Sequence, residues 1–296
     1  MPDIGLRLNK DMLVLSAPID TTLARQGVDV DRDRELLSLI EPEAVHAAYR
    51  LEMITGAQCL VTNTTKITKA RLTHVNMDDR AGEIAAAALA VTRSLKPQHI
   101  LAEIGPTRLP LDASSASSLK QNRDQYAEAA CAFGEEGFDA YFLNGMTHAA
   151  DMQCALMGIR KQSDKLVFAS VTLDAQGRLK GPIPDIAEAA AMMAEYGADV
   201  VGFESAAPLC QVLETAQKLR QAVHAPLLVQ LAVGKNNPKQ QRETAENPYF
   251  CPDTMIGAAT QLRAAGVQFL RASGNATASY TGALVAASDG FDVVLH

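Results

Sequence analysis

Residues 184–204 read PDIAEAAAMMAEYGADVVGFE, and this stretch decides the fold. Pro184 and Asp185 are typical of a helix start, and the apolar residues that follow recur at the spacing of one helix face. Gly197 and Ala198 then indicate the helix end, immediately before an apolar run at 199–204 that is typical of a buried parallel strand. The stretch therefore predicts one helix–strand step of an α/β fold.

The same alternation of amphipathic segments and short apolar runs recurs along the whole chain. The predicted strands lie at 12–16, 58–62, 99–103, 139–143, 165–171, 199–204, 225–232 and 267–272. The predicted helices lie at 41–55, 79–95, 121–136, 149–160, 185–196, 209–223, 253–265 and 278–288. Repeats of this kind favour a closed parallel barrel over an open sheet. We therefore predict an α/β fold, a single (β/α)8 TIM-type barrel domain over residues 1–296, since such a barrel takes about 250 residues.

The composition fits a globular chain and excludes several other classes of protein. Hydrophobic residues make up 48% and charged residues 21%, which excludes a disordered chain. The net charge is −7 and no basic run is present, so we expect no binding to nucleic acid. A helix needs about 20 apolar residues to cross a bilayer, and no apolar stretch in the sequence is that long. The N-terminal residues also lack the apolar segment of a signal peptide. We expect a cytoplasmic protein that does not bind a membrane.

Functional residues are expected at the carboxyl ends of the strands, where the active sites of such barrels form. Two long loops, 106–120 and 234–252, follow the third and seventh predicted strands and reach this face. Among the polar residues at the strand ends, we predict catalytic roles for Glu103 and Glu204. The predicted ligand-binding residues at this face are Thr62, Asn63, Thr64, Asn144, Thr172, Arg271 and Ser273.

Two groups of these residues have a structural interpretation beside the functional one. Thr62, Asn63 and Thr64 are short polar residues, which either bind a ligand or satisfy the backbone of a loop. Glu204 and Arg271 carry opposite charges on the sixth and eighth strands. They are either an ion pair that serves structure or an anion-binding arginine beside an acid/base carboxylate. The ion pair is slightly favoured, because buried ion pairs commonly serve structure.

Several segments of the chain match a known family in order and in spacing. They are VTNT at 61–64, EIGPT at 103–107, SVTLD at 170–174 followed by GRL at 177–179, GADVVG at 197–202, and the segment 266–284. Together they resemble the homocysteine S-methyltransferase family, including the homocysteine-binding barrel of cobalamin-dependent methionine synthase. The resemblance covers nearly the whole chain and implies the same barrel fold.

The resemblance implies a zinc site that this sequence does not retain. The family holds zinc with three thiolates, one after the sixth strand and a Cys-Cys pair after the eighth, and the zinc activates the homocysteine thiol. The corresponding positions here are Ser205, Ser273 and Gly274. Serine is a poor zinc ligand and glycine has no side chain to offer. No cysteine follows Cys251, so a shifted alignment does not restore the site. We expect no bound metal.

The groups that bind the homocysteine amine in the family have also changed. The Asp-Gly step of its first strand is Ser16-Ala17 here, and the acidic residue of its fourth strand is Asn144. Two carboxylates that would neutralise an ammonium group are thus replaced by neutral side chains. The joint change of zinc ligands and amine ligands predicts a different ligand.

These observations lead to one preferred function and two alternatives. We expect a methyl- or one-carbon-transfer enzyme that acts without zinc on a small molecule other than homocysteine, bound at the barrel mouth. No tightly bound cofactor is expected, and a corrinoid or a folate would be supplied by a partner protein. The first alternative is a non-catalytic binding subunit, for example of a corrinoid protein. The second alternative, a zinc-dependent homocysteine S-methyltransferase, is disfavoured because the zinc ligands are missing. The sequence is also compatible with a homo-oligomer.

Overall fold

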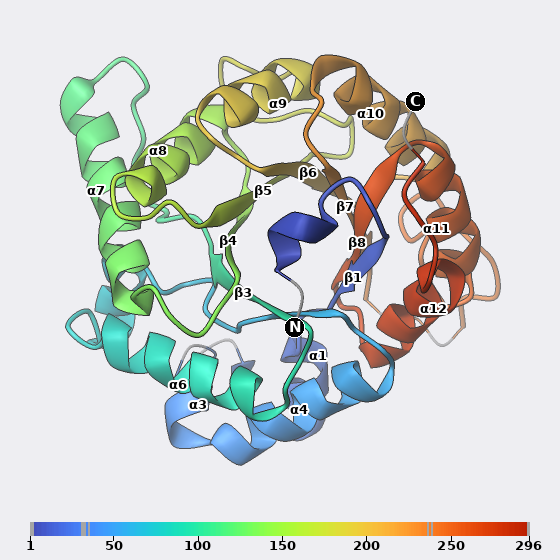
Figure 1. Cartoon of the computed structure of the whole chain (residues 1–296), viewed down its shortest axis with the longest axis horizontal. Helices are drawn as coiled ribbons and strands as arrows, with labels where there is room; N and C mark the ends of the chain where they lie inside the picture. Colours follow the sequence, from blue (N-terminus) through green and yellow to red (C-terminus); the bar gives the residue numbers. More distant parts are fainter. Residues whose placement is uncertain (1–2, 31–33, 35, 236, 238, 295–296) are drawn as a thin grey trace.

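The computed structural model describes residues 3–30, 34, 36–235, 237 and 239–294. The strands form a closed barrel in which each pairs in parallel with the next and β8 returns to β1 (Figure 1). They are β1 (Leu13–Leu15), β2 (Cys59–Val61), β3 (His99–Ile104), β4 (Ala140–Met146), β5 (Leu166–Thr172), β6 (Val200–Ser205), β7 (Leu227–Val233) and β8 (Val267–Gly274). The predicted TIM-type barrel is confirmed.

A ring of helices surrounds the barrel (Figure 1). Its members are α4 (Pro42–Ile54), α6 (Ala81–Ser94), α7 (Ala116–Phe133), α8 (Ala149–Arg160), α9 (Ile186–Glu195), α10 (Leu209–Ala222), α11 (Thr254–Ala264) and α12 (Ala278–Ser288). The stretch 184–204 forms α9 and β6 as predicted, and the Asp185 carboxylate caps α9 by accepting from the backbone N–H groups of Ala187 and Glu188. No helix among the described residues is long and apolar enough to cross a membrane.

One predicted helix boundary is wrong, and several short helices were not predicted. The helix predicted at 121–136 begins at Ala116, because the Ser115 hydroxyl caps it by accepting from the backbone N–H of Ser118. The loop after β3 is correspondingly shorter than the predicted 106–120. The additional short helices are η1 (Ile4–Arg7), α1 (Asp20–Arg25), α3 (Leu37–Ile40), α5 (Lys69–Leu72) and η2 (Thr73–Val75).

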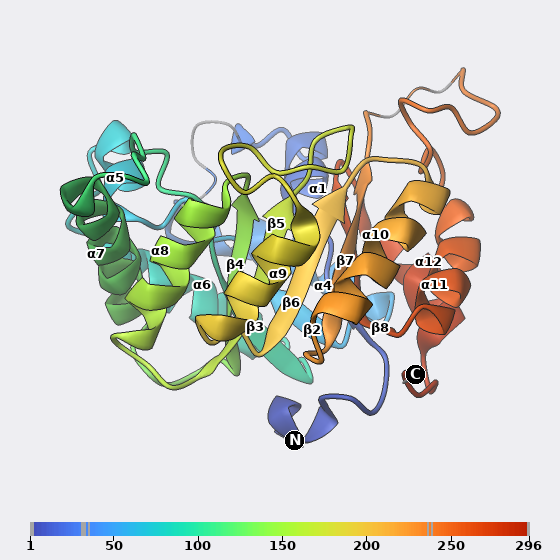
Figure 2. The same cartoon turned by 90° about the horizontal axis from the view of Figure 1, so that it is seen from above.

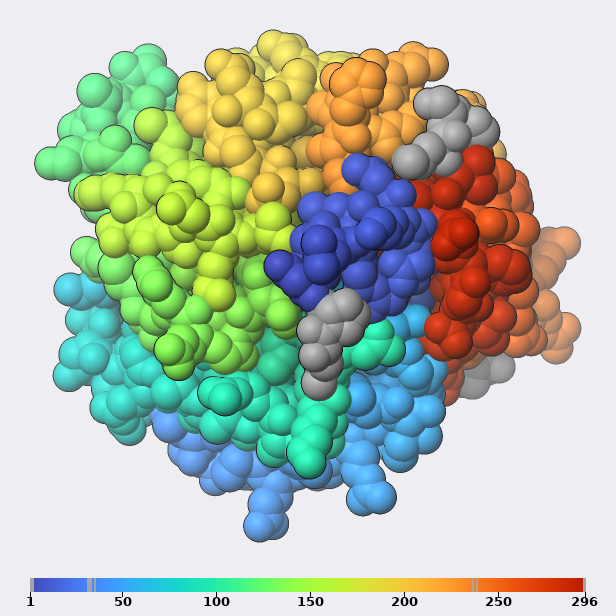
Figure 3. Space-filling model, in the orientation of Figure 1, coloured from blue at the N-terminus to red at the C-terminus, as the bar shows by residue number. Residues whose placement is uncertain are grey.

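Side chains that point into the barrel form an inner core of their own. Phe168 of β5 and Phe269 of β8 meet edge to face there, with ring centroids 4.8 Å apart. Ile4 of η1 joins this core, and the N-terminal segment covers that end of the barrel (Figure 3). The opposite end carries the carboxyl ends of the strands and the loops that follow them (Figure 2). Because side chains alternate along a strand, Ser170 and Arg271 also point inward, two residues nearer this open end.

Candidate functional site

Arg271 lies at the centre of the polar side chains in the barrel mouth. It is only 2% exposed, and its Nε donates to the Ser16 carbonyl oxygen at 2.9 Å. Its Nη1 donates to Gln230 Oε1 at 3.2 Å and lies 3.5 Å from Glu103 Oε1, with which it forms an ion pair. The guanidinium also lies 5.3 Å from the centre of the Phe142 ring. A buried guanidinium is tolerated because these groups satisfy it.

The carboxylate of Glu103 is bound on both oxygens. Asn144 Nδ2 donates to Oε1 at 2.6 Å and Thr65 Oγ1 donates to Oε2 at 2.7 Å. Gln230 completes the arrangement, because its Nε2 donates to Asn144 Oδ1 at 2.8 Å and to Ser170 Oγ at 2.7 Å. We call these residues, Glu103, Asn144, Gln230 and Arg271, the mouth network. Each charge in it is paired and hydrogen-bonded, as burial requires.

Thr62, Asn63 and Thr64 hold the backbone around this network. Thr62 Oγ1 accepts from the backbone N–H of Glu103 at 3.0 Å, and Thr64 Oγ1 donates to the Glu103 carbonyl oxygen at 2.7 Å. The Asn63 amide donates to the Arg34 carbonyl oxygen at 3.1 Å and accepts from Ser38 Oγ at 2.9 Å. These contacts favour the structural interpretation of the three residues, which fix the end of β3 and the segment that follows α1.

The predicted ion pair between Glu204 and Arg271 is wrong, because Arg271 pairs with Glu103. Strand register places Gln230 of β7 between Glu204 of β6 and Arg271 of β8. The guanidinium therefore contacts Gln230 and reaches across the barrel to β3. Glu204 Oε2 instead accepts from Thr172 Oγ1 of the neighbouring strand at 2.8 Å. The structure thus separates the two predicted catalytic carboxylates into one that is closely bound and one that is more open.

The two sides of the mouth differ in exposure. Glu103 and Arg271 are buried, whereas Asn144, Thr172 and Glu204 are partly exposed. Near α1 an ion pair joins Asp20 Oδ2 to Arg34 Nη2 at 3.0 Å, and both side chains are partly exposed. Burial raises the pKa of Asp20, an effect that the Arg34 charge opposes. Asn144, Thr172 and Glu204 thus make β4, β5 and β6 one side from which a ligand can reach the network.

The residues at the family's zinc positions do not fit a zinc ion. Ser205 Oγ accepts from the backbone N–H of Ala207 at 3.1 Å. The buried Ser273 Oγ has no hydrogen-bond partner among the described residues. Gly274 has a left-handed φ of +64°, and a Cβ there would lie 2.6 Å from the Val233 carbonyl oxygen. A cysteine therefore cannot be accommodated at 274 unless the end of β7 shifts.

No group of three or more His, Cys, Asp or Glu side chains is arranged to hold a metal in the part of the chain that the structure describes. The carboxylates of Glu204 and Glu103 both accept hydrogen bonds from protein groups. The described residues therefore do not fit the zinc site that the family implies.

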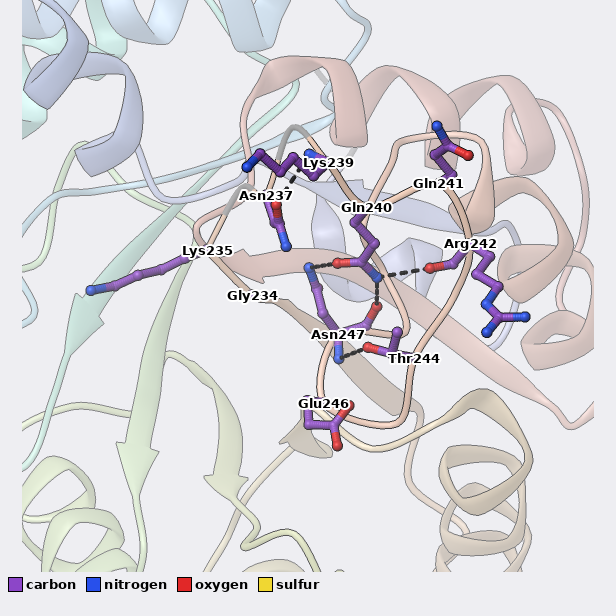
Figure 4. Close-up of a pocket in the computed structure, with 10 residues that line it drawn as sticks. All are labelled: Gly234, Lys235, Asn237, Lys239, Gln240, Gln241, Arg242, Thr244, Glu246 and Asn247. Atoms are coloured by element: carbon purple, nitrogen blue, oxygen red, sulfur yellow. Dashed lines mark hydrogen bonds between the residues drawn. The ribbon is translucent and has the colours of Figure 1, made fainter.

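A separate hollow of about 890 Å³ lies within the loop after β7 (Figure 4). Gln240 and Asn247 bind each other across it, with Asn247 Nδ2 donating to Gln240 Oε1 at 3.0 Å. Lys235 points away from the other residues drawn (Figure 4). None of the predicted site residues lines this hollow, so the loop does not form the centre of the site.

A protein-family model matches the chain over most of its length. The model of the homocysteine S-methyltransferase family covers residues 13–271. The chain belongs to this family. That match includes β1 through the mouth residue Arg271 and so spans the network described above. No curated protein sequence matches the chain.

Solved structures of a homocysteine methyltransferase have the same fold. The metallated form of MmuM, the homocysteine methyltransferase of Escherichia coli, gives a TM-score of 0.75 at 16% identity, and the oxidized form gives 0.77 at 16%. In both cases the match covers 93% of this chain and 96% of that one. A complete pyruvate carboxylase from Rhizobium etli gives 0.55 at 15%, over 97% of this chain and 25% of that one. At these identities the likeness shows the fold alone.

The roles of Thr65, Ser170 and Gln230 are not predicted by the sequence pattern. Gln230 and Ser170 lie inside apolar strands, at positions two residues from the inner-core residues Leu228 and Phe168. Strand alternation therefore indicated that both point inward. Their partners were not predictable, because Gln230 bonds to β4, β5 and β8 at once.

Proposed function

We propose that the chain is a methyl- or one-carbon-transfer enzyme of the homocysteine S-methyltransferase family that uses no zinc and acts on an acceptor other than homocysteine. The observation that carries the proposal is the composition of the barrel mouth. Ser205, Ser273 and Gly274 supply no thiolate, and Gly274 has no room for a side chain. Asn144, Thr172 and Glu204 remain partly open at the same mouth, where a small molecule can reach them.

The absence of zinc ligands limits the acceptor chemistry. A neutral thiol is a poor nucleophile, and the family overcomes this with a metal. A thioether has a lone pair that is reactive without a metal, and so has an amine in its neutral form. Such an acceptor forms its bond to the methyl carbon as the donor–methyl bond breaks, and an amine then releases a proton. Glu204 is placed to accept that proton, since among the described residues only Thr172 hydrogen-bonds to its carboxylate.

Glu103 has a different role in this proposal. Both of its oxygens are engaged by Asn144, Thr65 and Arg271, so it holds the amide of Asn144 in place instead of moving a proton. The methyl group comes from a small donor, or from a corrinoid or folate carried by a partner protein. When bound, such a carrier supplies an activated methyl group to the mouth.

The proposal is tested by following a labelled methyl group. Homocysteine is incubated with S-methylmethionine, betaine or methylcobalamin, and the same donors are offered to a panel of amines and thioethers. We expect no methionine above the level without enzyme, because Ser16 and Asn144 replace the carboxylates that bind the homocysteine amine. We expect label on an acceptor of the panel. Steady methionine formation by the protein would contradict the proposal.

A pair of matched variants tests whether methyl transfer takes place at the barrel mouth. Glu204→Gln should lower the rate of transfer to an amine by about 10²–10⁴-fold, the usual contribution of a general base. Glu128→Gln changes an exposed carboxylate on α7 and should leave the rate unchanged. Equal rates for the two variants would remove Glu204 from the mechanism. Saturable binding of a methylcobalamin-loaded protein without any transfer would favour the non-catalytic subunit.

A further inference from the structure

A cavity of about 420 Å³ lies beside the mouth network, between the loops that follow β3, β4 and β5. It is lined by Arg108, Gly145, Thr147, His148, Asp151 and Lys180, among others. Gly145, which directly follows the network residue Asn144 on β4, belongs to this lining. Cavities of this size accommodate small-molecule ligands or parts of them.

The charges around this cavity are mainly positive. Arg108 and Lys180 are both exposed, and no hydrogen bond or ion pair to the Arg108 guanidinium occurs among the described residues. The acid in the lining is Asp151, whose carboxylate accepts from Tyr126 Oη at 2.7 Å. Burial raises the pKa of Asp151, and the nearby His148 opposes this effect. The cavity therefore offers cationic groups, while its carboxylate is directed to a tyrosine.

The backbone adds to this preference. Helix α8 begins at Ala149, its N-cap residue His148 makes no side-chain capping bond, and Asp151 is the acidic residue of its first turn. The start of a helix carries a partial positive charge and free N–H groups, which favour anions. Arg108 has a left-handed φ of +59°. The preceding residue, Thr107, fixes this turn with its buried hydroxyl. The hydroxyl donates to Asn122 Oδ1 at 2.8 Å and accepts from the backbone N–H of Leu109. The guanidinium is thus carried on a fixed turn at the cavity edge.

We propose that this cavity binds the anionic group, a carboxylate or a phosphate, of a small molecule whose remaining part lies over Asn144. Arg108 and Lys180 would pair with the anion, and the start of α8 would contribute N–H groups. The inference concerns binding and does not depend on the proposed transfer reaction.

The test is a calorimetric titration of the full chain at constant ionic strength. One arm uses inorganic phosphate and the other glutarate, so that the two sources of negative charge are distinguished. We expect saturable binding of at least one anion to the unmodified protein. Arg108→Gln and Lys180→Gln should each weaken that binding by about tenfold or more, as expected for a lost charge-assisted contact.

A matched variant provides the control. Arg50→Gln replaces an exposed arginine on α4, in the outer ring of helices, and should bind the anion as the unmodified protein does. Far-ultraviolet circular dichroism of each variant verifies that the fold is retained, which is expected because Arg108 and Lys180 are exposed. The proposal is overturned if neither anion saturates at up to about 100 mM. It is also overturned if Arg108→Gln and Arg50→Gln bind the anion equally.

Discussion

Replacing Arg271 with methionine should lower the free energy of unfolding at pH 7 by about 3–5 kcal/mol. The substitution leaves Glu103, 2% exposed, without its ion-pair partner in the barrel interior. Asn144 and Thr65 still donate to the carboxylate, but neither carries a charge. The Ser16 carbonyl oxygen also loses the donor at 2.9 Å. Urea denaturation followed by circular dichroism measures the change.

Two further variants distinguish the effect of breaking the ion pair from the effect of lost packing on stability. In the double variant Glu103→Gln with Arg271→Met, no carboxylate is left unpaired, so it should be clearly more stable than Arg271→Met alone. Arg80→Met breaks a surface pair, in which Arg80 Nη2 lies 2.6 Å from Glu83 Oε2, and should change stability little. If Arg271→Met unfolds at the same urea concentration as Arg80→Met, the buried ion pair has no structural importance.

Glu52 should make the protein less stable as the pH rises from about 5 to about 8. This residue of α4 is 1% exposed, and its Oε2 accepts from Thr281 Oγ1 at 2.7 Å and from the Ala17 N–H at 3.0 Å. Burial raises its pKa from 4.5 to about 7, although both hydrogen bonds and the Arg271 charge oppose this rise. The folded protein therefore holds a proton between pH 4.5 and 7 that the unfolded chain has released.

The sign and the size follow from this difference in proton binding. The stabilisation is complete below about pH 4.5 and is lost as the pH rises through about 7. The pKa of Glu52 is 4.5 in the unfolded chain and about 7 in the folded protein. At 1.36 kcal/mol for each pH unit, this difference stabilises the folded protein by about 3 kcal/mol. Glu52→Gln cannot ionise, so its advantage in stability over the unmodified protein should grow by about this amount between pH 5 and 8. A difference that stays constant with pH would show that Glu52 titrates normally.

The fold was predictable because its signals are local and repeated. The stretch 184–204 formed α9 and β6 as its residue pattern indicated, and the same pattern recurred around the barrel. The short helices α1 and α3 were missed because each has only a few residues, 6 and 4, too few to establish a period. They matter nonetheless, because Asp20 of α1 forms an ion pair with Arg34.

The site was predictable only in part, because its contacts depend on closure of the barrel. Glu103 is an acid at the end of an apolar strand, and an acid that is buried in this way needs a partner. The partner itself, Arg271, lies 168 residues away in sequence, and strand register placed Gln230 between it and the expected Glu204. The steric exclusion at Gly274 likewise depends on how β8 pairs with Val233 of β7.

The zinc content of the purified protein tests the central claim most directly. The protein is expressed in zinc-supplemented medium, dialysed against buffer without chelator, and its metal measured by elemental analysis. We predict far less than one zinc ion per chain, because Ser205, Ser273 and Gly274 replace the thiolates and a side chain at 274 would meet the Val233 carbonyl oxygen at 2.6 Å. About one zinc ion per chain, retained through dialysis, would contradict the account.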